Sequence, residues 1–154
     1  MIAVVIFFGV MFYVLNYLNG TVAGYSADFS AESMESRASQ IGEMLVMNRG
    51  VWSSGNPVVM GLAEGWPVLN STKISWLNTS CNIDYAGFST KLDVPPGKRL
   101  KLTVVNETSK AKMADCQWGQ AVSGNVTKAE TTRYAVLSTG DVVSVYVCIW
   151  STGK

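Results

Sequence analysis

The chain has 154 residues, with 12 basic and 11 acidic side chains and a formal net charge of +1. This length suits one compact domain plus an extended element, and the near-neutral charge provides no basic face for nucleic acid. The sequence contains no histidine, so it lacks the usual general base and the commonest metal ligand. We find no catalytic or metal-binding motif, and we therefore expect neither an enzyme nor a cofactor.

The chain opens with an uncharged apolar segment. Its first eighteen residues, MIAVVIFFGVMFYVLNYL, are nearly all aliphatic or aromatic, and the first charged side chain is Asp28. About twenty apolar residues can span a bilayer. A cleaved signal peptide normally starts with basic residues, whereas the first one here is Arg37. The segment is open to four interpretations: signal peptide, membrane anchor, buried helix of a soluble domain, or helix packed against its copies in a filament.

The helical pattern continues beyond this segment. After Gly20, apolar residues recur mostly every three or four positions as far as Leu45, with charged residues between them, which is typical of an amphipathic helix. We predict one helix over about residues 1–47, roughly 70 Å long. Residues 1–19 would form a filament core or membrane segment, and residues 20–47 would be amphipathic. The residues expected to pack in a filament core are Ile2, Val5, Ile6, Phe8, Val10, Phe12, Tyr13, Leu15, Tyr17 and Leu18.

Residues 48–154 are expected to form an extracellular β-rich domain. The Gly-, Ser- and Pro-rich stretch 48–66 predicts a loop or short turns. Thr72 is expected to cap a short helix, and a second short helix or turn is expected over residues 83–92.

Strand patterns dominate the rest of the chain. RLKLTVVN alternates apolar and polar residues, KMADCQW is a weaker strand candidate, and RYAVLSTGDVVSVYVCIW predicts a hairpin that turns at residues 138–141. Both faces of the last strand are fairly apolar, so we expect it to be central or covered on both sides. Together with the N-terminal helix, these patterns predict an α+β fold. Its head would be a small antiparallel β-sandwich-like domain or a strongly curved antiparallel sheet.

Five positions match the Asn-x-Ser/Thr sequon, more than chance predicts, which favours an exported and glycosylated surface. Four of them fall in predicted loops or strand ends. The candidates are Asn70, Asn78, Asn106 and Asn125, with Asn19 the weakest because it ends the apolar segment.

Three cysteines allow one disulfide and one spare thiol in an exported protein. We favour a bridge between Cys81 and Cys116, because Cys148 alternates into a strand face as a small buried hydrophobe does. Cys148 stays open as an alternative partner, and so does a bridge between chains.

Three stretches resemble the archaeal type IV pilins and archaellins, proteins with class III signal peptides. They are the opening apolar helix, MLVMNRGVWSSGNPVVMGLAEG, and the terminal RYAVLSTGDVVSVYVCIW. Bacterial pilins carry a Glu near the start of the mature helix, whereas this chain has Val5, so the archaeal branch is more similar.

The resemblance implies export, leader cleavage and helical assembly into a cell-surface filament from a membrane-inserted precursor. The expected partners are copies of the chain itself, and the membrane before assembly. The expected role is a structural pilin for adhesion or surface attachment. The alternative is a monomeric membrane-anchored surface protein, or a minor pilin with a binding role.

Overall fold

The computed structural model describes residues 2–117 and 126–151, and within these ranges it describes the side chains of residues 7–17 and from 31 onward. The chain divides into two compact units, Met1–Ser33 and Met34–Lys154. We refer to the second unit as the sheet domain. Helix α1 runs over Ile2–Met47, the range predicted for the N-terminal helix, and the boundary between the two units falls inside it. Each unit is described by itself.

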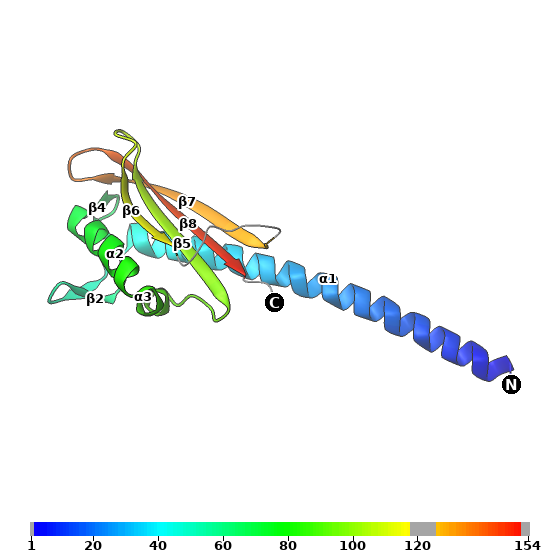
Figure 1. The fold of residues 1–154 in the computed structure, drawn as a ribbon. Coiled ribbons are helices and arrows are strands. Elements are labelled where there is room, and N and C mark those ends of the chain that lie inside the picture. The colour runs from blue at the N-terminus through cyan, green and yellow to red at the C-terminus, as the bar shows by residue number, and fades with distance from the viewer. Residues whose placement is uncertain (1, 118–125, 152–154) are drawn as a thin grey trace. The chain divides into compact units, whose positions relative to one another are not determined.

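The sheet domain is organised around a curled six-stranded sheet with the strand order β3-β4-β7-β8-β5-β6 (Figure 1). Neighbouring strands are antiparallel except β4 and β7, which are parallel. The strands are β3 (Ala63–Gly65), β4 (Val68–Leu69), β5 (Lys98–Asn106), β6 (Lys112–Gln117), β7 (Lys128–Leu137) and β8 (Val142–Ser151). The α+β class is therefore confirmed, while the expectation of a purely antiparallel sheet is wrong.

The predicted terminal hairpin is confirmed as β7 and β8, and β8 is a central strand between β7 and β5. On β8, the side chains of Val143, Val145, Val147 and Ile149 are fully buried. The register pairs Leu102 of β5 with Val147. Because side chains alternate along a strand, these residues share one apolar face, which we call the inner face.

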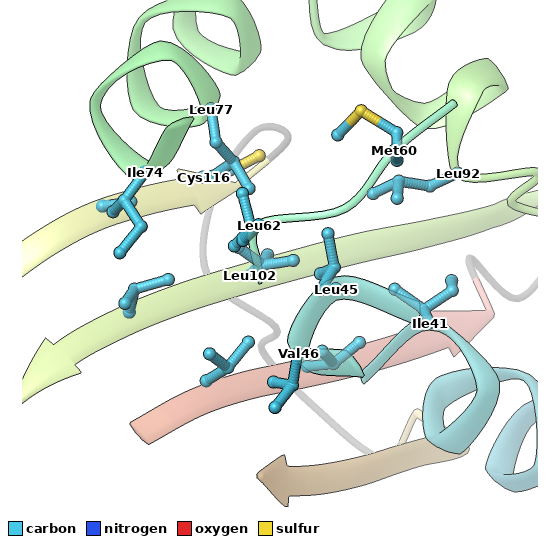
Figure 2. Packing of buried hydrophobic residues seen from close by; sticks show 14 of the residues in the cluster. Ile41, Leu45, Val46, Met60, Leu62, Ile74, Leu77, Leu92, Leu102 and Cys116 are labelled. Atoms are coloured by element: carbon cyan, nitrogen blue, oxygen red, sulfur yellow. The ribbon is translucent and has the colours of Figure 1, made fainter. Parts of the chain in front are cut away.

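Helices, and not a second sheet, cover the inner face. The C-terminal part of α1 buries Met34, Ala38, Ile41 and Leu45, at the spacing of one helix face. Figure 2 shows side chains of α1, α2 (Ser71–Ile83) and β5 meeting in one core. The prediction of a β-sandwich is therefore wrong. The chain uses α1 and α2 to bury the apolar side of the sheet, so a second layer of strands is not required.

Gly42 shows how closely α1 lies on this face. A Cβ atom at Gly42 would lie 3.3 Å from side-chain carbons of both Thr131 and Arg133 on β7, and 3.9 Å from Val147 on β8. On the same contact, Arg133 donates a hydrogen bond of 2.7 Å to the hydroxyl of Ser39 on α1. A small residue at position 42 therefore permits the close approach of the helix to the sheet.

The stretch 48–66, predicted as a loop or short turns, contains three short strands joined by turns. β1 (Val51–Ser53) and β2 (Asn56–Val59) form a separate hairpin. The two turn residues, Ser54 and Gly55, have φ values of 50° and 81°, and positive φ at both positions matches the twist of a two-residue hairpin. At the base of the hairpin, a Cβ at Gly61 would overlap the carbonyl oxygen of Asn48. The glycines here thus serve a turn and a close backbone approach as well as a loop.

Helix α2 begins two residues earlier than predicted. Its N-cap is Asn70, not Thr72, because Asn70 Oδ1 accepts hydrogen bonds from the backbone N–H groups of Thr72 (2.9 Å) and Lys73 (3.2 Å). The second short helix is confirmed as α3 (Tyr85–Lys91), which Asp84 caps through Gly87 N–H.

Candidate assembly helix and modification sites

The apolar segment of α1, which we define as residues 7–17, is exposed at every position. Phe12 and Tyr13 are each 71% exposed. Since consecutive helical residues point in different directions, exposure at every position means that apolar side chains surround the helix. Exposed apolar patches larger than a few hundred Å² usually mark interaction sites.

The polar groups of this segment are few. Asn16 donates a hydrogen bond of 2.9 Å from its side-chain amide to the carbonyl oxygen of Phe12. Because the amide already has a partner within the helix, burying it would cost less than burying a free amide. Because the apolar segment has no charged residue and its one amide is hydrogen-bonded, it is suited to burial against other apolar helices.

The predicted packing residues fall in two groups. Ile2, Val5, Ile6 and Leu18 lie outside the described side chains. The exposed ones are Phe8, Val10, Phe12, Tyr13, Leu15 and Tyr17. The prediction missed Phe7, Met11 and Val14, which are also exposed and apolar. The unbroken apolar run was the signal that would have identified them, because no helix face is polar.

Two sequons have the same local geometry. Asn106 ends β5, and its Oδ1 accepts hydrogen bonds from the N–H groups of Thr108 (2.9 Å) and Ser109 (3.0 Å). This repeats the arrangement in which Asn70 Oδ1 caps α2. In both sequons the side-chain oxygen Oδ1 is the atom that accepts the hydrogen bonds. Among the residues that the structure describes, the side-chain nitrogen Nδ2 of neither asparagine donates a hydrogen bond. Because an N-linked glycan is attached to Nδ2, hydrogen bonding within the described residues does not occupy the modification site of either sequon.

Asn78 differs from these two. It lies inside α2, not in a loop or at a strand end as predicted, and its Oδ1 accepts a hydrogen bond of 3.1 Å from the backbone N–H of Asp115 on β6. β6 is an edge strand of the sheet, so Asn78 satisfies a backbone donor that an edge strand leaves without a partner. The structure thus gives Asn78 a packing role. The other two candidates, Asn19 and Asn125, lie outside the described side chains.

The favoured disulfide is confirmed between Cys81 on α2 and Cys116 on β6, with their Cα atoms 5.7 Å apart. Cys148 is a free, buried cysteine on β8, as predicted. Its thiol lies 3.8 Å from Glu130 Oε1, and burial raises the pKa of this thiol. A buried, protonated thiol is a poor nucleophile, so Cys148 is poorly suited to form a disulfide with another chain.

The opposite, outer face of the sheet buries Cys148 and Trp150 of β8. Lysine–carboxylate pairs lie on this face and in the turn that follows β5. Three carboxylates accept hydrogen bonds from lysine ammonium groups at 2.7, 2.9 and 2.8 Å. In each case the lysine bond is the largest cause of a pKa below the ordinary value. We call Glu107, Asp115 and Glu130 the outer-face carboxylates.

In the described ranges, no three His, Cys, Asp or Glu side chains are grouped so as to hold a metal ion. Within those ranges there is also no helix with the length and apolar character needed to cross a membrane.

Comparisons of the chain with protein-family models, with curated proteins and with solved structures returned no match.

Proposed function

We propose that this chain is the structural subunit of an extracellular, type IV pilus-like filament of the archaeal kind, in which the apolar segments of many copies pack together. The observation that carries the proposal is the exposure of every residue from 7 to 17, of which all but Gly9 and Asn16 have aliphatic or aromatic side chains. A helix that is apolar on all sides is stable only when lipid or other chains surround it. In this proposal, copies of the same helix provide that surrounding.

Burial of these side chains supplies the driving force. Each large aliphatic or aromatic side chain contributes roughly 1.5–3 kcal/mol when it is fully buried. In a helical polymer every subunit contacts several neighbours, because head-to-tail interfaces repeat without closing. The absence of charge from Met1 to Ala27 avoids the large cost of burying an unpaired charge.

The proposal also assigns roles to the rest of the chain. The apolar segments would form the filament core, and the sheet domains would form the filament surface. Sugars on Asn70 and Asn106 would lie on that surface, where adhesion or surface attachment takes place. The presence of one disulfide and several sequons supports an extracellular location.

The test is assembly of a charge variant. Val10→Asp should abolish filaments in electron micrographs of purified material, because every subunit would bury an unpaired carboxylate among apolar helices. Val58→Asp is the matched control, since Val58 lies on β2 and is 70% exposed, compared with 58% for Val10. The control should assemble normally.

Two results would contradict the proposal. Normal filaments from Val10→Asp would show that position 10 is not buried between subunits. Native material that consists only of detergent-soluble monomers would favour a membrane-anchored surface protein instead.

A further inference from the structure

A hollow of about 350 Å³ lies between the β1–β2 hairpin and the first turns of α2, within the roughly 300–1,000 Å³ range of ligand pockets. Its walls combine two aromatic rings with a few polar groups. The lining residues are Trp52, Gly55, Asn70, Thr72, Lys73 and Trp76.

The protein holds the two tryptophan rings of the hollow in place. Their centroids are 5.2 Å apart, with the ring planes at 85°. The indole N–H of Trp52 donates to the carbonyl oxygen of Gly61 (3.2 Å), and that of Trp76 donates to Asn56 Oδ1 (3.3 Å). Both rings are half-buried. Since each N–H already has a partner, the ring surface that faces the hollow is apolar and preorganised.

Lys73 helps to hold the Trp52 ring and the start of α2 in place. Its ammonium group lies 5.4 Å from the Trp52 ring centroid and donates to the carbonyl oxygens of Arg49 (2.6 Å) and Ala63 (2.8 Å). These bonds fix α2 against the segment around the hairpin. The walls of the hollow therefore come from two separate parts of the chain, the β1–β2 hairpin and the start of α2, and the protein holds them together.

The wall of the hollow includes the asparagine of a sequon. Asn70 Oδ1 is held by two backbone N–H groups, whereas its Nδ2 makes no hydrogen bond in the part of the chain that the structure describes. A sugar attached to that nitrogen would begin at the wall of the hollow. Sugars present an apolar face of C–H groups, which suits contact with an aromatic ring that is held in position.

We propose that the first sugar of a glycan on Asn70 lies in this hollow against Trp52 and Trp76 and fastens the β1–β2 hairpin to α2. The inference rests on the glycosylation of Asn70 that the proposed function includes. Attachment joins the anomeric carbon of a sugar to Nδ2. The activated donor, a glycosyl diphosphate, loses its diphosphate with the bonding electron pair, and Nδ2 loses one proton to a base.

The hairpin is the part of the sheet domain that would gain most from this contact. It is a two-stranded sheet separate from the main sheet, and an isolated two-stranded hairpin is at best marginally stable. Pro57 is the one buried residue of its two strands, and its valines at positions 51, 58 and 59 are exposed, so little apolar burial holds it. A sugar that touches both tryptophans would bridge β1 and α2 directly.

Asn106 provides a matched control within the same chain. It has the same oxygen-capping geometry, but it ends β5 beside a turn with polar contacts, which include the ion pair of Glu107 with Lys110. Asp can replace Asn at both positions with the capping oxygen retained. Asn70→Asp and Asn106→Asp therefore remove one glycan each without removing the cap.

The experiment measures hydrogen exchange of the full chain, made once in a host that glycosylates it and once in a host that does not. With glycans, Asn70→Asp should speed exchange of the hairpin amides about tenfold, the effect expected for loss of one aromatic contact. Asn106→Asp should leave those amides unchanged. Without glycans, neither variant should change them. NMR spectra of the glycosylated chain should also show contacts between sugar C–H protons and indole protons.

The inference is overturned if mass spectrometry finds Asn70 unmodified in native material, if Asn70→Asp leaves hairpin exchange unchanged in the glycosylated chain, or if no sugar–indole contact is seen. Filaments are detected independently by electron microscopy, so these outcomes leave the assembly proposal intact.

Discussion

Removal of the Cys81–Cys116 bridge should lower the free energy of unfolding of the sheet domain by about 4 kcal/mol. The two cysteines are 35 residues apart in the sequence, and the chain-entropy relation for a loop of this size gives roughly 3.8 kcal/mol at 25 °C. The bridge is expected to act mainly on the unfolded chain, which it prevents from expanding between α2 and β6. Both cysteines are buried, so replacement by Ala adds only a small cavity.

Urea unfolding of detergent-dispersed monomers, followed by tryptophan fluorescence, measures this change. The double variant Cys81→Ala/Cys116→Ala is compared with Cys148→Ala, which removes a buried sulfur but no bridge and should cost about 1 kcal/mol. Addition of a reductant to the unmodified protein should reproduce most of the loss. If the double variant loses no more than the Cys148 control, the loop-closure reasoning is wrong for this protein.

Three further outcomes follow from the same structure, each measured by urea unfolding. Gly61→Ala should destabilise the sheet domain by roughly 1–3 kcal/mol because the added methyl overlaps Asn48, whereas Gly9→Ala, where a Cβ meets nothing within 4 Å, should leave the domain's stability unchanged. Leu102→Ala should cost roughly 2–5 kcal/mol, since the side chain is fully buried; a smaller loss would contradict the core described above. The outer-face carboxylates have lowered pKa values in the folded state, so their stabilisation is complete above the unfolded value of about 4.3 for Glu and is lost as the pH falls through the folded values. Unchanged stability between pH 6 and about 3 would count against those ion pairs.

Several elements of the sheet domain were predictable because their signals are local. β5 alternates apolar and polar residues, and the turn at residues 138–141 separates two strand patterns that pair as β7 and β8. The buried positions Met34, Ala38, Ile41 and Leu45 recur with the helical period. A short window of sequence contains all the information that these predictions need.

The errors concern contacts between distant parts of the chain. The layer that covers the inner face, the parallel pairing of β4 with β7, and the position of Asn78 against β6 all depend on which elements meet. The short strands β1 and β2 were also missed, because a Gly- and Ser-rich composition is shared by loops and tight hairpins. A Ser-Gly pair between short apolar runs was the available signal for that turn.

By itself, the sequence determined the uncharged apolar segment, the helical stripe that meets the sheet, the strands with strong alternation and the positions of the sequons. These properties depend on residue type and spacing along one element. Only the tertiary structure decided that Cys81 pairs with Cys116, that Asn78 is engaged by an edge strand, and that Asn70 opens onto a hollow with two tryptophans. Such features arise where elements far apart in the chain come together, and the packing that selects them is a property of the whole core.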